Sequence, residues 1–415
     1  MIFRRMAWAG LILILTWVAG LVAGEDASSP GWFQYRGPNR DGKSSETGLV
    51  HSWDSSGPRE VWRVPVGAGF SAITIVGNRL FTMDSDEQTE YALSLDAESG
   101  KTIWRVPVGP IFKDVNGDGP RSGPTVDSDL VFVLGSRGHL MALSTASGEV
   151  VWQLQYQDAF DSTLPTWAFS TAPLVDGDLL IMEVGGSGER AIAALEKRTG
   201  EIRWTAQEAN VAYSSPIVLE LGGIKQFVFL LQQRIVAVNR EGEELWRVPF
   251  APKLDIKPAL PLFVAPDLVM VAASYDTGAK VVRLAAEDGS VTAQEVWTSR
   301  FMRSHFNTSI ALDEHIYGFD AATLRCLDAK TGERGWAKRG LGKGSLIYAD
   351  GMFIVLSERG KLVLLEATPE GYRELASHQV LKGRCWTAPS LWNGQLYVRN
   401  HTELVRLDLR DRASE

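Results

Sequence analysis

The hydrophobic positions of this chain fall in short runs that are separated by polar turn residues. In the stretch from Leu95 to Trp104, an apolar run ends at Asp96, and Trp104 follows Gly100 by four positions. An Asp, Asn or Ser side chain at the end of a strand can accept a backbone hydrogen bond and start a turn. Glycine then adopts the positive φ that closes the turn. The pattern predicts two antiparallel strands, with a large ring buried on the second one.

The same strand–turn–strand pattern returns at regular intervals. It is found again at residues 143–152, 195–204, 238–246 and 327–336. Recurrence of one phrase every 40 to 50 or so residues is typical of repeat architectures. The anchor positions lie 39 to 52 residues apart, and seven hold tryptophan: Trp62, Trp104, Trp152, Trp204, Trp246, Trp297 and Trp336, with Leu375 at the eighth.

A second set of turns gives the same count. Apolar pairs joined by polar turns, such as Val126 to Leu130 and Val175 to Leu179, also occur eight times. Each unit then contains four short strands, which predicts an all-β, eight-bladed β-propeller of four-stranded antiparallel blades. The last unit, from Trp386 to Leu409, has three strands, while residues 60–66 have no unit before them. We therefore expect this N-terminal strand to pair with the C-terminal blade and close the ring.

The first 24 residues are typical of a secretory signal peptide. Arg4 and Arg5 precede an apolar stretch, and small residues at 22–24 provide a cleavage site. The alternative is an uncleaved anchor in the inner membrane, because residues 6–24 are uncharged and just long enough to span a bilayer. We expect an exported protein, periplasmic or secreted, with an arm at 25–59, the propeller at 60–410 and a tail at 411–415.

Charge narrows the class of partner. The chain carries a net charge of −8, and loss of the leader leaves 40 basic and 50 acidic residues. Nucleic-acid binding requires a basic footprint, so no nucleic acid is expected as a partner. We expect a monomer that contacts a membrane only through an uncleaved N-terminal segment.

The repeat resembles the pyrroloquinoline quinone (PQQ) type of propeller blade, which is built around an Asp-Ala-x-x-Gly-x-x-x-Trp phrase. The resemblance covers nearly all of residues 31–410. The chain is also similar to secreted bacterial PQQ-like propeller proteins in three segments: Trp32 to Gly42, Gly119 to Asp127 and Ala367 to Leu375. The same blade family includes quinoprotein dehydrogenases and BamB, a propeller of outer-membrane protein assembly.

The resemblance to quinoproteins also implies a cofactor site, which the sequence does not match. Such enzymes carry an adjacent Cys-Cys pair over PQQ and a Ca²⁺ held by Glu, Asn and Asp. Here Cys326 and Cys385 are 59 residues apart, so PQQ is not expected. An oxidising compartment permits a disulfide between them. We favour two buried free thiols in different blades, Cys326 within a strand and Cys385 at a strand start.

The central funnel is the predicted ligand site, because the innermost strand of each propeller blade begins there. Aromatic, basic and amide side chains at these starts could hold a planar, sugar-like or anionic ligand. The alternative is that they only pack where the strands converge. The candidates are Arg121, Trp167, Tyr213, His305, Asn307, Lys343 and Trp386.

Asp114, Asn116 and Asp118 form the first half of a Ca²⁺-binding loop. The acid required at the twelfth position is missing, because Thr125 stands there. Ca²⁺ could still bind if other loops contributed ligands, whereas the alternative is an Asn/Asp/Gly turn without metal.

Two functions follow from these features. The first is a non-catalytic binding or scaffold protein of the cell envelope, with a protein partner or small-molecule ligand on one face of the ring. The second is an enzyme that uses the central funnel, either a quinoprotein-like oxidoreductase or a carbohydrate-active protein. A fold does not fix a function, so the choice depends on the site.

Overall fold

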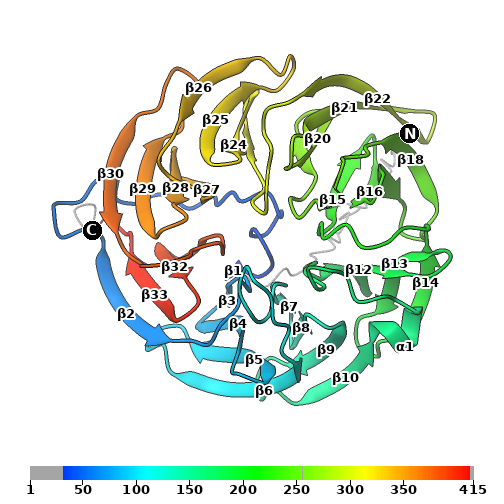
Figure 1. Ribbon diagram of the computed structural model, residues 1–415, viewed down its shortest axis with the longest axis horizontal. Coiled ribbons are helices and arrows are strands. Elements are labelled where there is room, and N and C mark those ends of the chain that lie inside the picture. Colours follow the sequence, from blue (N-terminus) through cyan, green and yellow to red (C-terminus); the bar gives the residue numbers. More distant parts are fainter. Residues whose placement is uncertain (1–30, 255, 412–415) are drawn as a thin grey trace, which may run out of the picture.

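A computed structural model describes residues 31–254 and 256–411. Within them, eight antiparallel sheets stand around a common axis, and one short helix, α1 (Tyr156–Phe160), lies at the rim (Figure 1). The predicted eight-bladed propeller is confirmed. The predicted leader, residues 25–30 of the arm and residues 412–415 of the tail lie outside the described residues.

The first four blades follow the chain in order. The first contains β1 (Gly31–Trp32), β3 (Thr74–Val76), β4 (Arg79–Ser85), β5 (Thr89–Asp96) and β6 (Thr102–Pro110). The second contains β7 (Thr125–Asp127), β8 (Leu130–Leu134), β9 (His139–Ser144) and β10 (Val150–Gln155). The third contains β11 (Leu174–Asp176), β12 (Leu179–Gly186), β13 (Arg190–Glu196) and β14 (Ile202–Ala206). The fourth contains β15 (Ile217–Leu221), β16 (Ile224–Leu231), β17 (Arg234–Val238) and β18 (Glu244–Pro249).

The other four blades complete the ring. The fifth contains β19 (Leu262–Val264), β20 (Leu268–Ala273), β21 (Gly278–Glu287) and β22 (Ser290–Ser299). The sixth contains β23 (Ile310–Leu312), β24 (His315–Asp320), β25 (Thr323–Asp328) and β26 (Arg334–Lys338). The seventh contains β27 (Ser345–Ala349), β28 (Met352–Leu356), β29 (Lys361–Glu366) and β30 (Glu374–Gln379). The eighth contains β31 (Ser390–Trp392), β32 (Gln395–Arg399), β33 (Glu403–Asp408) and β2 (Arg59–Pro65).

The two ends of the chain close the ring. Strand β2 pairs antiparallel with β33, from Arg59 opposite Asp408 to Pro65 opposite Glu403. This is the closure that the sequence predicts. It supplies the outer strand of the eighth blade and leaves β33 with no unpaired edge.

The anchor tryptophans join neighbouring blades. Six of them donate an indole Nε1 hydrogen bond of 2.8–3.0 Å to a backbone carbonyl of the next blade, as Trp104 does to Thr145. In five of these six contacts the ring also covers the turn glycine of that blade, and a Cβ on Gly148 would lie 2.8 Å from Trp104; Gly371, after Trp336, is the exception. The repeated Gly and Trp are therefore two sides of one contact between blades.

The anchor contacts differ where the sequence pattern differs. Trp246 donates to Gln226 Oε1 within its own blade, and a Cβ added to the next turn glycine, Gly289, would meet no atom within 4 Å. Trp297 follows Gly289 by eight positions instead of four, and β21 and β22 form a hairpin of ten-residue strands there. Leu375, at the eighth anchor position, is 38% exposed.

The N-terminal arm crosses the centre of the ring (Figure 1). Apart from the two-residue strand β1, it is irregular, as the sequence predicts. Two fully buried guanidinium groups hold it in place: Arg40 donates to the carbonyls of Ala172 and Pro173, and Arg36 donates to that of Ser309. The arm thus connects the first, third and sixth blades.

Two sequence expectations need correction or comment. Cys326 and Cys385 are free and buried in different blades, as predicted, and Cys326 lies in β25. Cys385 is not at a strand start, because β31 begins only at Ser390.

In residues 31–254 and 256–411, no helix is long and apolar enough to cross a membrane.

Candidate functional site

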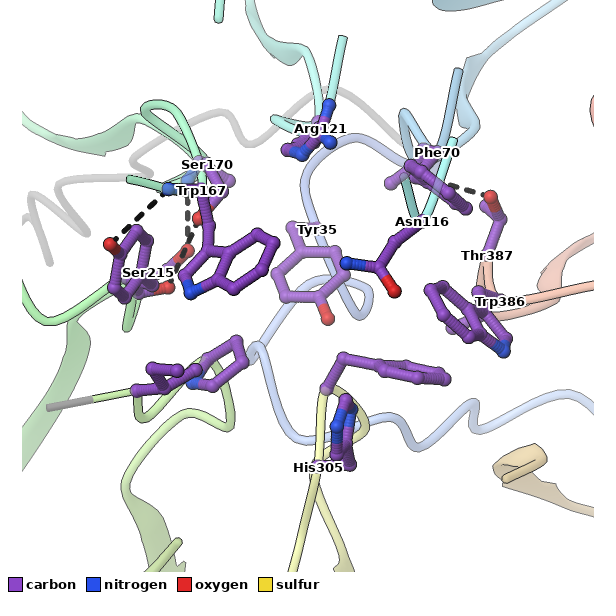
Figure 2. A pocket seen from close by; sticks show the side chains of 18 of the residues that line it. Tyr35, Phe70, Asn116, Arg121, Trp167, Ser170, Ser215, His305, Trp386 and Thr387 are labelled. Atoms are coloured by element: carbon purple, nitrogen blue, oxygen red, sulfur yellow. Dashed lines mark hydrogen bonds between the residues drawn. The ribbon is translucent and has the colours of Figure 1, made fainter. Parts of the chain in front are cut away.

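A pocket of about 260 Å³ lies on the axis of the ring, at the end where the loops lead into the innermost strands. All eight blades contribute a residue to its lining. The arm contributes Tyr35, which lies between Trp167 and Trp386 in Figure 2. The volume is just below the roughly 300–1,000 Å³ of sites for drug-sized molecules, so it suits a ligand of one or two rings.

The lining follows a fixed register relative to the innermost strands. In seven blades, the residue four positions before that strand lines the pocket, and most of these side chains are large. The residue two positions before the strand is small in five blades: Ala72, Gly123, Ala172, Ser215 and Ala388. Alternate residues of an extended segment face the same side, so the pocket is wide at the small residues and narrow at the large ones.

Aromatic rings form most of the wall. Phe70 stacks on Trp386 with ring centroids 5.4 Å apart, and Phe306 packs on the same indole at 4.5 Å. Trp167 lies on the opposite side of the pocket (Figure 2). Offset and tilted aromatic contacts of this kind hold the rings in fixed orientations. The pocket therefore presents flat apolar faces on two sides to a bound ring.

The backbone is strained beside two of these aromatic residues. Tyr213 has a φ of 75°, and Ala168, next to Trp167, has a φ of 65°. A positive φ is unfavourable for a bulky residue and persists only where the surrounding structure enforces it. Tyr213 is also tied in place, since its hydroxyl accepts a 3.4 Å hydrogen bond from the backbone N–H of Trp167. The strain orients side chains toward the pocket.

Arg121 supplies a positive charge at the wall. Its guanidinium donates to the carbonyls of Gly117 and Gly119 and lies 3.8 Å from an Asp114 carboxylate oxygen. Burial lowers the pKa of Arg121, although nearby Asp114 and Glu90 oppose this effect, and the group stays a cation at neutral pH. The loop thus holds a fixed charge, mostly removed from solvent, beside the aromatic faces.

His305 and Lys343 line another side of the pocket. The Nε2 atom of His305 is 3.0 Å from the Tyr275 hydroxyl, and its buried Nδ1 has no hydrogen-bond partner among the described residues. Burial, followed by the charge of Lys343, lowers the pKa of His305 to about 4. His305 is therefore neutral at physiological pH and acts as a polar rather than a charged group.

Glu358 organises this side without lining the pocket. Its carboxylate accepts a 3.0 Å hydrogen bond from the Trp386 indole and one of 3.1 Å from the backbone N–H of Lys343. Among the described residues, the ammonium group of Lys343 forms no ion pair. Lys343 and Arg121 provide two positive charges against Asp114, the one carboxylate among the described lining residues, so this lining favours an anionic group.

The structure brings together six of the seven predicted site residues: Arg121, Trp167, Tyr213, His305, Lys343 and Trp386. These residues were predicted at the starts of the innermost strands. They lie instead in the loops before those strands, two to seven residues ahead of each strand start. Asn307 does not line the pocket. It is 6% exposed, and its amide donates a 2.7 Å hydrogen bond to Gly344 in the next blade.

Several lining residues were not among the predicted ones. Tyr35 comes from the arm, whose position in the ring has no signal in the repeat pattern. Ile256 and Pro258 come from the loop that leads into the fifth blade, for which no site residue was predicted. Pro258 lies four positions before β19, so the register described above would have located it. Tyr275, in the turn between β20 and β21, has no equivalent in the register.

The polar side chains of the predicted Ca²⁺ loop accept hydrogen bonds from the loop's own backbone. Asp114 accepts a hydrogen bond from the backbone N–H of Asn116, and Asp118 accepts one from that of Asp114. Asp114 and Asn116 line the pocket, and Figure 2 shows the Asn116 amide projecting into it, whereas Asp118 is not in the lining. In the described part of the chain, no three His, Cys, Asp or Glu side chains cluster as metal ligands would.

Comparison with known protein families identifies the repeat. The family model described as outer membrane protein assembly factor BamB matches residues 89–337 and 231–411, which together make up most of the chain. The chain belongs to this family. No curated protein matches the chain in sequence.

Solved structures with the same fold include members of this family and others. BamB from Moraxella catarrhalis is 15% identical with a TM-score of 0.61, and the match covers 84% of this chain and 99% of that one. Quinohemoprotein alcohol dehydrogenase from Comamonas testosteroni is 11% identical with a TM-score of 0.65, covering 94% and 82%. The designed Ika8 protein is 13% identical with a TM-score of 0.58, covering 85% and 100%. At these identities, the likeness concerns the fold alone.

The residues of the pocket do not fit the quinone site that the resemblance implies. Such a site needs two adjacent cysteines, but Cys326 and Cys385 lie in different blades and neither lines the pocket. Its Ca²⁺ needs several oxygen ligands that include carboxylates, whereas Asp114 is the single carboxylate in the described lining and is paired with Arg121. We therefore derive no chemistry through a quinone.

Proposed function

We propose that this protein is an exported binding protein that holds a small amphipathic anion in its central pocket. The observation that carries the proposal is the composition of the lining, in which Trp167 and Trp386 stand on opposite sides and Arg121 and Lys343 supply positive charge. Aromatic faces provide contact area, and a few polar groups fix the orientation of the ligand. The leader-like sequence at residues 1–24 supports export.

A non-catalytic role is favoured over an enzymatic one by the state of the polar groups. Arg121 is held by two backbone carbonyls, Asp114 by a backbone amide and Glu358 by Trp386 and a backbone amide. These groups are arranged to hold the walls rather than to transfer protons. A protein partner on the same face would use the same aromatic mouth, for example by inserting one side chain.

The test uses the fluorescent probe 8-anilinonaphthalene-1-sulfonate, which combines aromatic rings with a sulfonate. We expect saturable binding with one site, weakened about tenfold in Lys343→Gln through loss of a charged contact. Trp386→Ala should weaken it further. Lys101→Gln, which removes an exposed charge on the rim, is the matched control and should bind as the wild type does. Equal affinity in all four proteins would refute binding in the pocket.

The alternative enzymatic reading has its own test. The purified protein is titrated with PQQ and Ca²⁺ while absorbance and melting temperature are recorded. We expect neither to change. A saturable shift that is lost in Arg121→Ala would instead favour a quinoprotein-like oxidoreductase.

A further inference from the structure

The central pocket has a neighbour with which it shares a wall. A groove lies beside it on the same face, over the third and fourth blades, and Trp167, Tyr213 and Ile256 line both depressions. The shared residues include the two aromatic ones that the strained backbone at Ala168 and Tyr213 positions. The two depressions are therefore adjoining parts of one surface and share a wall.

The groove differs from the pocket in its chemistry. Its polar lining consists of hydroxyl and amide side chains, namely Thr163, Thr166, Asn210 and Gln232, and its described lining contains no Asp, Glu, Lys or Arg. Leu254, which is 48% exposed, adds an apolar contact. The pocket, in contrast, carries the cations Arg121 and Lys343. Among the described residues, the site thus runs from an end with two cations to an end rich in hydroxyl and amide groups.

The construction of the groove argues against an extended peptide as the ligand. A peptide that binds by strand addition needs an unpaired strand edge. The described lining residues of the groove lie in loops and turns, except Gly185 in β12. Strand β11 pairs with β12 only at Leu179–Ile181, but the backbone at Gly185 is covered by Val211, because a Cβ at Gly185 would clash with a Val211 side-chain carbon. No strand edge is therefore offered by this described lining. Side-chain amides and hydroxyls beside aromatic faces instead match the hydroxyl groups and flat faces of sugar rings.

We propose that the pocket and the groove form one elongated site for an acidic oligosaccharide. The uronic acid at its end occupies the central pocket, where its carboxylate faces Arg121 and Lys343. The neutral sugar units continue past Trp167 into the groove, toward Asn210 and Thr166. This inference rests on the proposed function, because it names the ligand class of the same pocket.

The test measures affinity as a function of chain length. Calorimetric titrations compare glucuronic acid with a series in which one glucuronic acid is attached to one, two or three xylose units. Neutral xylo-oligosaccharides of the same lengths provide the comparison for charge. We expect the acidic series to bind more tightly as it lengthens, by about fivefold for a sugar that gains one hydrogen bond in the groove. The neutral series should bind at least about tenfold more weakly.

A groove variant locates the added affinity. In the double variant Thr166→Ala, Asn210→Ala, both changed residues are exposed, so folding should be preserved, as a thermal melt would verify. We expect it to bind glucuronic acid like the wild type but to lose the gain from added xylose units. The matched control, Asn39→Ala with Thr292→Ala, changes exposed residues outside both depressions and should keep that gain.

The outcomes separate this inference from the proposal on which it rests. If glucuronic acid and the longest oligosaccharide bind equally well, or if the groove variant keeps the full gain, the elongated site is refuted while pocket binding stands. Equal binding of neutral and acidic chains would refute the role of the uronic acid. Groove-dependent binding of a tetraglutamate peptide would refute the carbohydrate class. Absence of binding by glucuronic acid, its oligosaccharides and the sulfonate probe together would refute the proposed function itself.

Discussion

Glu183 is a buried carboxyl group with unusual titration. It lies in β12 and is 1% exposed; one oxygen accepts a 2.8 Å hydrogen bond from the backbone N–H of Ala212, and the other has no partner among the described residues. Burial raises the pKa of Glu183 to about 8, a rise that the nearby charge of Lys257 partly opposes. The folded protein therefore holds a proton on this residue at neutral pH.

We predict that this proton makes folding stability depend on pH. In the unfolded chain, the group ionises near its ordinary pKa of 4.5, so the free energy of unfolding falls as pH rises from about 4.5 to about 8. Glu183→Gln removes that loss and should be more stable than the wild type at about pH 8.5, by the order of a few kcal/mol. Urea unfolding at about pH 5 and about pH 8.5 measures the difference. The exposed Glu201→Gln should follow the wild-type profile, and equal pH dependence in both variants would contradict the prediction.

At the level of residues, sequence reasoning located side chains that share the ring axis but not their contacts. His305 and Trp386 were recognisable because they precede innermost strands of the repeats. Asn307 has the same sequence signal, yet it faces the neighbouring blade and bonds to Gly344. Asn307 follows His305 by two positions, and only the backbone path of the loop decides which one faces the pocket. Tyr35 could not be placed at all, because the arm belongs to no repeat.

At the level of elements, the turn glycine and the tryptophan of the preceding blade act as one unit in five blades. Gly148 has a φ of 75° and lies under the Trp104 ring, while Gly351 has a φ of 76° and has open space at its Cβ position. Comparing alanine at Gly148 with alanine at Gly351 therefore separates the free-energy cost of a Cβ at positive φ from the cost of its contact with the indole.

We predict that Gly148→Ala destabilises the protein more than Gly351→Ala. Both changes place a side chain at positive φ, which costs about 1 kcal/mol. Gly148→Ala must also displace the indole of Trp104, for a further 1–3 kcal/mol or so from overpacking. Denaturant unfolding of the two variants gives the comparison. Equal losses of stability would show that the indole does not press on the turn.

The strand–turn–strand units themselves were predictable because turn chemistry and the anchor ring are local signals. Asp96, Gly100 and Trp104 lie within ten residues and report a single turn and the strand after it. The point at which each innermost strand begins is not local in this sense. These strands contain three to five residues, and their starts depend on where the loops from eight blades converge.

At the level of the molecule, ring closure depends on seven residues far from their partner in sequence. Replacing β2, residues 59–65, with a Gly/Ser linker of equal length leaves β33 with an unpaired edge. We predict a lower melting temperature together with association that increases with concentration. Replacing residues 51–57, most of which are exposed, is the matched control and should leave the association state of the wild type unchanged. A linker variant with the stability and the association state of the wild type would contradict the role of β2.

The closed ring could be predicted because of the mismatch between the chain ends: one strand too many at residues 60–66 and one too few after Leu407. The path of the arm could not, because Arg36 and Arg40 are charged residues that the sequence pattern places on a surface. In the structure both are buried, since their guanidinium groups bond to carbonyls at or just before the starts of the innermost strands.

The arm that crosses the axis distinguishes this ring from a propeller with an open axis. A propeller with an open axis is a tube, through which a solute can pass from one face to the other. Here residues of the arm cross the axis, held by Arg36 and Arg40, and Tyr35 of the arm lines the pocket. Under the binding role proposed above, a solute that entered between Trp167 and Trp386 would meet Tyr35 of the arm and would leave by the side on which it entered.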